Sequence, residues 1–163
     1  IPEVLAQLNA WFAMAGESID THGGEVLKFM GDAVLAIFPT SAAQDRPAAC
    51  RKALEAALEF HRRTEIENDR RRSAGVAALV HGLALHVGEV AYGNVGARQR
   101  LDFTVIGPAV NRASRLLDLA KKLDRSVLVS EALAREIDPP LVELGSFNLR
   151  DVEEPQRVFT LPE

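Results

Sequence analysis

Apolar and polar positions repeat along the chain with a helical period in some stretches and a strand period in others. Residues 2–24 carry apolar side chains three and four positions apart, with Pro2 at the start and a glycine pair at the end. This spacing predicts an amphipathic helix, because such positions share one helical face. The same spacing after Pro47 predicts a second helix. We expect that helix to end where the charged stretch 65–75 begins, as a mobile surface connection.

Shorter apolar segments bounded by glycine predict strands. Residues 24–38 read as a hairpin that bends at Gly31, and further glycine-punctuated strands are expected within 79–107. A third helix is predicted at 108–123, followed by short strands at 126–130, 141–150 and 156–161. Mixed helices and hairpin strands indicate an α+β fold with helices on one sheet. No repeat or dividing linker is present, so residues 1–163 are expected to form a single domain.

Composition narrows the classes of protein that fit this pattern. The chain has 163 residues, 47% hydrophobic and 26% charged, which is typical of one globular domain. A net charge of -4 gives no electrostatic footprint for nucleic acid, and no apolar run is long enough to predict a membrane span. The single cysteine, Cys50, cannot form an internal disulfide and fits a packed helical position in a reducing compartment.

The predicted hairpin carries two charged side chains that a bend between apolar strands does not require. Asp32 lies beside Gly31, where aspartate is common in turns, but a carboxylate is also a metal ligand. Lys28 lies four residues earlier, and strict alternation places it on one face with Val26 and Met30. It is either an edge lysine with its ammonium in water or a group that contacts a ligand.

A second set of polar residues lies near the start of the helix predicted at 108–123. Asn111 and Arg115 are four positions apart, so both project from one side of its first turns. Unpaired backbone N–H groups there favour anions, and a guanidinium presents a planar fork of donors to phosphate. A helix-turn role for Asn111 and a surface ion pair for Arg115 are the ordinary interpretations. With Lys28 and Asp32, they could supply a metal carboxylate, a base or phosphate contact and two groups for a charged transition state.

Three segments, 23–39, 82–96 and 102–116, resemble the central motifs of the class III nucleotidyl cyclase catalytic domain, in the family's order. Residues 141–161 resemble its closing strands. The resemblance implies a ferredoxin-like α+β core, with an antiparallel sheet and helices packed on one face, and a head-to-tail homodimer with sites at the interface. It also implies attack of a nucleotide's 3′-hydroxyl on its own α-phosphorus, with release of pyrophosphate. Two divalent ions per complete site, Mg²⁺ or Mn²⁺, are the implied cofactors.

The family's site residues can be carried over onto this sequence position by position. Asp32 matches the second of two metal-binding aspartates, and Lys28 matches a lysine that recognises adenine. Thr104 falls where many members use aspartate for adenine and a bacterial-type subgroup has threonine, although an ordinary β-branched strand residue fits equally well. Asn111 matches the asparagine that orients the ribose, and Arg115 the arginine that stabilises the pentavalent phosphorus.

These matches imply an adenylate cyclase that converts ATP to 3′,5′-cyclic AMP. A lysine can donate to the N1 acceptor of adenine but would meet the N1–H donor of guanine. Family members that act on GTP resemble this chain except for a glutamate at that position. The implied dimer takes Asp32 from one chain and Lys28, Asn111 and Arg115 from the other. We expect a cytoplasmic location, with any tether to the inner membrane in segments outside these residues.

Two departures from the family pattern leave alternatives open. Arg150 resembles a basic phosphate contact, but Asp151 follows it where a glycine is usual. The family's first metal aspartate lies on a strand before the first helix, and residues 1–163 start after that point. We expect this strand to exist in the molecule, because a sheet without an inner strand exposes unpaired edges. Glu89 is a weaker acidic substitute.

Two other functions are alternatives to catalysis by an adenylate cyclase. The alternative is a catalytically inactive, cyclase-like dimerisation or regulatory module, which the missing aspartate favours and the retained Lys28, Asp32, Asn111 and Arg115 disfavour. A diguanylate cyclase is disfavoured because the hairpin turn reads MGDA, without the Gly-Gly-Asp/Glu-Glu-Phe motif.

Overall fold

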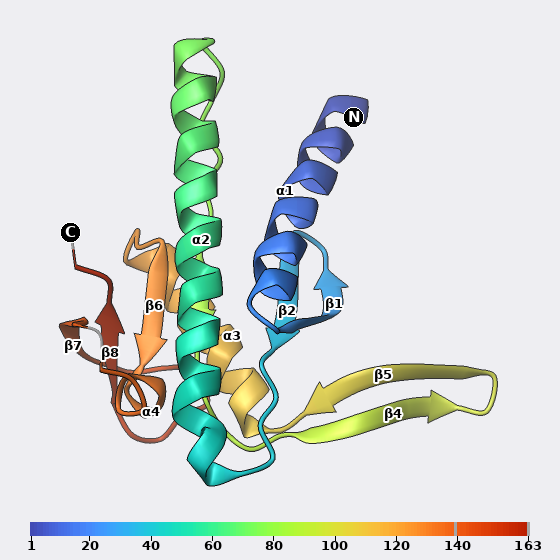
Figure 1. The fold of residues 1–163 in the computed structure, drawn as a ribbon, viewed down its shortest axis with the longest axis vertical. Helices are drawn as coiled ribbons and strands as arrows, with labels where there is room; N and C mark the ends of the chain where they lie inside the picture. Colours follow the sequence, from blue (N-terminus) through green and yellow to red (C-terminus); the bar gives the residue numbers. More distant parts are fainter. Residues whose placement is uncertain (139, 163) are drawn as a thin grey trace. The chain divides into compact units, whose positions relative to one another are not determined.

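The computed structural model describes residues 1–138 and 140–162, and for residues 100–104 it describes the backbone alone. The chain forms two compact units, Ile1–Val80 and His81–Glu163 (Figure 1). Each unit has its own set of helices and strands.

The first unit consists of two long helices and a hairpin. Its elements are α1 (Pro2–Thr21), β1 (Glu25–Met30), β2 (Ala33–Ile37), a 3₁₀ turn η1 (Ala43–Asp45) and α2 (Arg46–Ser73). Strands β1 and β2 pair antiparallel, and α1 packs against both α2 and the hairpin. Helix α1 ends before Gly23, whose φ of 80° is left-handed, so the glycine stop predicted there is confirmed.

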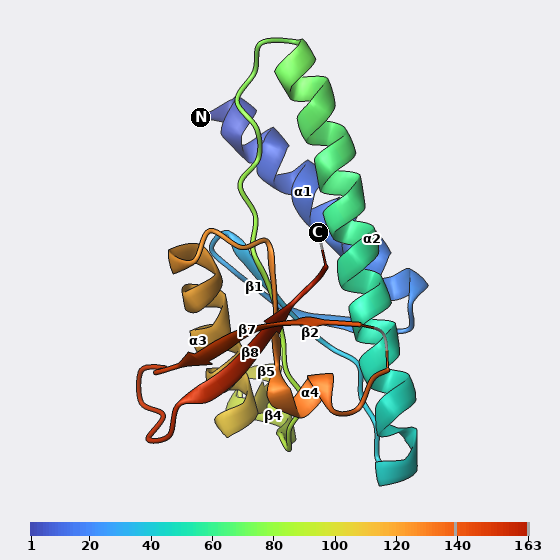
Figure 2. The ribbon, with the colours of Figure 1, turned by 90° about the vertical axis from the view of Figure 1, so that its left-hand side faces the viewer.

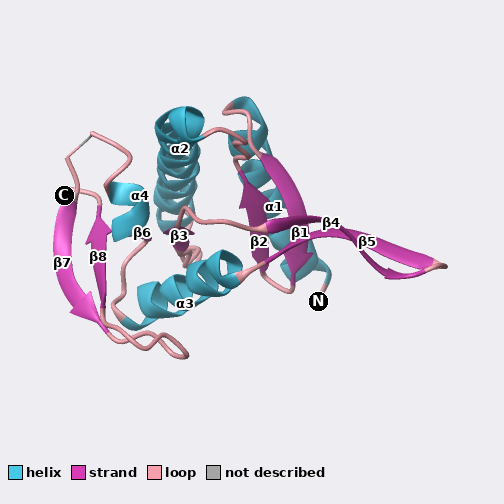
Figure 3. Ribbon diagram, turned by 90° about the horizontal axis from the view of Figure 1, so that it is seen from below, coloured by secondary structure: helices cyan, strands magenta, loops and turns pink. Residues whose placement is uncertain are grey.

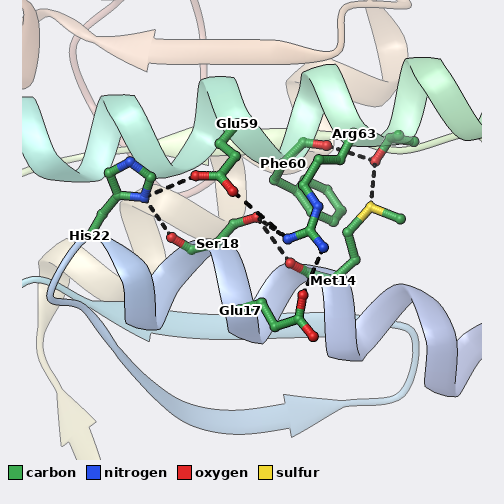
Figure 4. Close-up of polar contacts among 8 residues, drawn as sticks. Met14, Glu17, Ser18, His22, Glu59, Phe60 and Arg63 are labelled. Atoms are coloured by element: carbon green, nitrogen blue, oxygen red, sulfur yellow. Dashed lines mark hydrogen bonds and ion pairs between the residues drawn. The ribbon is translucent and has the colours of Figure 1, made fainter.

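An aromatic contact and a set of polar contacts join the two helices. Trp11 of α1 meets Phe60 of α2 edge-on, with ring centroids 5.2 Å apart. Arg63 of α2 donates to the carboxylate of Glu17 at 2.7 Å and to the hydroxyl of Ser18 at 3.5 Å (Figure 4). Ser18 is buried, so this contact reaches into the helix interface. Together these side chains fix how α1 lies along α2.

Helix α2 continues through the charged stretch that we expected to be a mobile connection, so that expectation was wrong. Its charged side chains pair with one another along the helix surface, as Arg72 does with Asp69 at 2.7 Å. Asn68 is only 2% exposed; its amide donates to the carbonyl of Leu79 at 3.0 Å, and its carbonyl accepts from the Leu79 N–H at 2.6 Å. The following segment therefore packs back on the helix and stabilises its last turns.

The second unit is built on a four-stranded sheet and one long helix. Its elements are β3 (Leu83–Leu85), β4 (Ala91–Ala97), β5 (Arg100–Ile106), α3 (Pro108–Lys122), β6 (Val127–Ser130), α4 (Glu131–Ala134), β7 (Val142–Phe147) and β8 (Gln156–Thr160). The sheet order is β3-β6-β8-β7, in which β3 and β6 are parallel and the other pairs antiparallel. Strands β4 and β5 form a separate antiparallel ribbon (Figure 3).

The core of the second unit lies between α3 and the sheet (Figure 2). Leu116 and Ala120 of α3 form one buried cluster with Leu128 of β6 and Val158 of β8. Helices and mainly antiparallel strands thus coexist as the sequence predicts, although the strands pair as three sheets and α4 was not foreseen. Within the described residues, no helix combines the length and apolar character that a membrane crossing requires.

We predict that Asn68→Ala lowers the free energy of unfolding by about 1–3 kcal/mol, because a buried side chain that makes two hydrogen bonds to the backbone is lost. Urea unfolding followed by circular dichroism measures this loss. The control is Asp69→Ala, which removes an exposed ion pair on the same turn and should change the stability by less than about 0.5 kcal/mol. Equal losses in the two variants would contradict the packing role of Asn68.

Candidate active site

The hairpin of the first unit presents Lys28 and Asp32 to solvent. The bend is formed by Gly31, whose φ of 63° is left-handed, followed by Asp32 in the turn. Both charged side chains are exposed. The predicted bend is confirmed, and it leaves the carboxylate and the ammonium free to meet a ligand or another chain.

A β-bulge changes the face assignment that strict alternation predicted for Lys28. Val26 is paired with Ala36, but Lys28 is paired with the adjacent residue Leu35, so Leu27 is the extra residue in β1. Because paired residues share a face, the bulge places Lys28 and Val26 on opposite faces, and the expectation that they share one was wrong. Sequence periodicity cannot register an inserted residue, since the apolar pattern of the strand remains unbroken.

On the opposite face from Lys28, the hairpin is fixed to α1. Phe29 follows Lys28 in the strand and packs against Phe12, with ring centroids 4.8 Å apart. The aromatic contact holds one side of β1, and the ammonium projects from the other.

In the second unit, a sharp strand-to-helix connection positions Asn111 and Arg115. Gly107 is the residue before α3 and has a φ of 154°. A Cβ at this position would lie 3.1 Å from the carbonyl oxygen of Glu89, so the backbone approaches too closely for a larger residue. Pro108 then begins the helix, where its missing N–H costs nothing. Asn111 is exposed on the first turn, as its spacing predicts.

Arg115 lies between two carboxylates. Its guanidinium Nη2 donates to Oδ2 of Asp151 at 3.2 Å, and its Nη1 lies 3.6 Å from Oδ2 of Asp118, one turn along α3. The Arg115 side chain is 28% exposed, whereas those of Asp118 and Asp151 are 55% and 73% exposed. The surface ion pair that was one interpretation of Arg115 is therefore present. Such exposed pairs are weak enough for another anion to displace.

The turn after β7 brings Arg150 close to this arrangement. The Nε of Arg150 lies 3.7 Å from the same Oδ2 of Asp151, and its side chain is 79% exposed. The structure thus gathers Asn111, Arg115 and Arg150 in the second unit, whereas Lys28 and Asp32 belong to the first. The remaining predicted residue, Thr104, pairs with Gly93 through its backbone, and its side chain lies outside the described residues.

Asp32 fits a hard divalent cation by its chemistry and exposure. A carboxylate oxygen suits Mg²⁺ or Mn²⁺, and Mg²⁺ is often bound by one or two carboxylates together with substrate phosphates. Within the part of the chain that the structure describes, no cluster of three His, Cys, Asp or Glu side chains includes Asp32. A metal held by Asp32 would therefore need further ligands from outside such a cluster, such as phosphates, water, another chain or the aspartate expected on the preceding strand.

Sequence reasoning missed a half-buried histidine beside the strand-to-helix connection. His86 Nδ1 lies 2.8 Å from Oγ of Ser130, which also accepts the Leu133 N–H at 3.2 Å. Since the hydroxyl accepts from Leu133, it is free to donate its hydrogen to a neutral imidazole. Burial, and secondly the positive charge of Arg112, lower the pKa of His86 from 6.5 to about 4.

His86 also lies against the first turn of α3. A Cβ at Gly88 would come within 3.3 Å of His86 Nε2 and 2.8 Å of the Ala109 side chain, so only glycine fits between them. The signal in the sequence was the His86–Gly88 pair after an apolar strand, but no local pattern distinguishes a packing histidine from an exposed one.

The chain matches a known family over most of its length. The model of the adenylate and guanylate cyclase catalytic domain matches residues 2–155. An adenylate cyclase of Anabaena cylindrica is 34% identical over 160 residues, which are 96% of this chain and 30% of that protein. Adenylate cyclase 1 of Rhizobium meliloti is 35% identical over 136 residues, 82% of this chain and 20% of that protein. The chain therefore spans less than a third of the length of these relatives.

Solved structures show the same fold. The adenylyl cyclase CyaB from P. aeruginosa has a TM-score of 0.85 at 22% identity, with 100% of this chain and 84% of that chain covered. The guanylyl cyclase Cya2 has a TM-score of 0.74 at 24% identity, with the same coverage. The α+β fold implied by the three sequence motifs is confirmed. It is shared by a protein named as an adenylyl cyclase and by one named as a guanylyl cyclase.

We predict that the wild-type protein loses stability as the pH falls from 6.5 to about 4, the interval between the unfolded and folded pKa values of His86. The unfolded chain binds a proton there while the folded histidine stays neutral, so acid favours unfolding. Urea unfolding at several pH values should show a shallower loss for His86→Asn, which cannot titrate but keeps a hydrogen-bonding atom near Ser130. Parallel profiles for the two proteins would contradict this role of His86.

Proposed function

Because the chain belongs to the adenylate and guanylate cyclase catalytic domain family, we propose that it is an adenylate cyclase domain. It converts ATP to 3′,5′-cyclic AMP and pyrophosphate at sites shared by two identical chains. The observation that carries the choice of ATP is the exposed ammonium of Lys28, on the same hairpin as Asp32. An ammonium can donate to the N1 acceptor of adenine and has no acceptor for the N1–H of guanine.

Each hairpin supplies the metal ligand to one site of the dimer and the base contact to the other. Asp32 would hold the divalent ions, which when bound help to ionise the 3′-hydroxyl and neutralise the leaving pyrophosphate. Lys28 orients the adenine by its donated hydrogen bond. Because adjacent strand residues alternate, Lys28 points away from the face anchored by Phe29, so the ammonium can reach the base while the hairpin stays packed on α1.

Helix α3 supplies the groups that position the sugar and stabilise charge. Asn111, exposed on the first turn, can hydrogen-bond the ribose and hold its 3′-hydroxyl in line with the α-phosphorus. Arg115 can donate from its planar fork to oxygens of the pentavalent phosphorus, where negative charge accumulates. Arg150, beside the same carboxylate, adds a second cation for the phosphates, and Thr104 is the remaining candidate for base recognition.

The second candidate function is a cyclase-like dimerisation or regulatory module without turnover. The observation that favours it is the isolation of Asp32, which belongs to no cluster of three metal-binding side chains among the described residues. A two-ion site needs more carboxylate than one turn residue provides. The two functions differ in whether any cyclic nucleotide is formed.

Product analysis with ATP and GTP tests the proposal. We expect the full gene product to form cyclic AMP from ATP in the presence of Mg²⁺ or Mn²⁺, and little cyclic GMP from GTP. Lys28→Glu should lower kcat/KM for ATP about ten- to a hundredfold, since it removes a charged hydrogen-bond donor from the base. Its affinity for metal-bound inorganic triphosphate, which has no base, should fall far less.

Lys52→Glu is the matched control, because it makes the same charge reversal at an exposed position of α2 in the same unit. Unchanged ATP kinetics in Lys28→Glu would remove the base-recognition role. Failure to form any cyclic nucleotide with either substrate would favour the regulatory module.

Complementation tests whether the site is shared by two chains. Asp32→Ala and Arg115→Ala should each be nearly inactive, with Asp32→Ala stable to within about 1 kcal/mol because it alters an exposed turn. Mixing them should restore roughly a quarter of wild-type activity, since half the randomly paired dimers are mixed and each has one intact site of two.

The matched control for complementation mixes Asp32→Ala with the double variant Asp32→Ala, Arg115→Ala, where no interface holds both intact residues. No recovery in the test mixture, with subunit exchange verified by differently tagged chains, would show that Asp32 and Arg115 do not act across an interface.

A further inference from the structure

Two arginines converge on one oxygen atom in the second unit. The Oδ2 of Asp151 lies 3.2 Å from Nη2 of Arg115 and 3.7 Å from Nε of Arg150. Arg150 and Asp151 are neighbours in the turn between β7 and β8, and the fold brings Arg115 of α3 to the same carboxylate. An anionic oxygen contacted by two guanidinium groups marks a position suited to phosphate.

Asp151 has a backbone conformation in which a residue with a charged side chain is uncommon. Asp151 has a φ of 61°, in the left-handed region where glycine is the residue of least strain. The turn is fixed on both sides, because the Val152 N–H donates to the carbonyl of Leu149 at 3.1 Å and Leu149 is buried. Asp151 therefore occupies a position whose backbone favours glycine and places its side chain between the two arginines.

From this arrangement we infer that Asp151 sets the affinity for nucleotide by competing with a substrate phosphate for Arg115 and Arg150. The inference rests on the proposed function for the identity of the ligand, a nucleoside triphosphate. The carboxylate holds the guanidinium groups in the free protein, and a phosphate oxygen takes its place when the nucleotide binds.

The exposure of the three side chains makes this exchange feasible. Arg115, Asp151 and Arg150 are 28%, 73% and 79% exposed, so water screens their attraction and the internal pairs are weak. A triphosphate carries several negative charges and offers oxygens in the bidentate geometry that guanidinium prefers. The carboxylate therefore lowers the affinity for phosphate without abolishing it.

Neutralising this carboxylate should tighten the binding of a triphosphate. Asn has nearly the same shape as Asp and tolerates the left-handed backbone, so Asp151→Asn removes the charge and keeps the turn. We expect isothermal titration calorimetry of the full gene product to show about three- to tenfold tighter binding of inorganic triphosphate in this variant. The probe has no base, so the result does not depend on adenine recognition or turnover.

Asp124→Asn is the matched control. Asp124 is an exposed aspartate of the same unit with a left-handed φ of 52°, so the substitution, the backbone conformation and the change of net charge are all the same. Its affinity for triphosphate should stay near that of the wild type. In a background of Arg115→Ala, the gain from Asp151→Asn should shrink to less than about twofold, because the competition is then largely removed.

The calorimetry tests the competition by Asp151, and the formation of cyclic nucleotide tests the proposed function, so either can fail alone. Binding by Asp151→Asn that is no tighter than by Asp124→Asn overturns the inference, as does a full gain that persists in the Arg115→Ala background. A merely structural role for Asp151 would leave the affinity unchanged or weaken it. Tighter, Arg115-dependent binding without any cyclic nucleotide product supports the competition and contradicts catalysis.

Discussion

The packing of α3 against the four-stranded sheet is the interaction on which the candidate phosphate-binding groups depend. Leu116 and Ala120 are 1% and 0% exposed, in a cluster with Leu128 and Val158. Burying a large apolar side chain contributes about 1.5–3 kcal/mol, so the rotation of the helix about its axis is strongly determined. Arg115, adjacent to Leu116, is thereby kept at the surface, where it can exchange one anion for another.

The hairpin of the first unit holds its candidate site residues with few packing contacts. A two-stranded hairpin is marginal in water by itself, and here Phe29 joins it to α1 through Phe12. The side chain of Lys28 lies on the face opposite that anchor because adjacent strand residues alternate, and the bulge places it opposite Val26 as well. Asp32 at the bend contributes little to packing, so it can be replaced without unfolding the unit.

Most of the charge in the candidate site of the second unit is compensated by neighbouring side chains. Arg115 is partly neutralised by Asp118 and Asp151, and partial burial beside Arg112 lowers the pKa of His86. A cluster of cations without a ligand repels itself, and carboxylates that pair with such cations relieve this repulsion.

Local periodicity, turn chemistry and contiguous motifs are sufficient to predict α1, the start of α2, α3, the bend at Gly31, the strand-to-helix connection at Gly107 and the candidate site residues. The course of α2 past residue 65, the face of Lys28 and the partial burial of His86 depend on tertiary packing, since an intrahelical charge pattern, a bulge or a packed histidine leaves no local signature. The same holds for Asp151. Asp151 and Arg115 are 36 residues apart in the chain, and the packing of α3 and the closing strands brings them together.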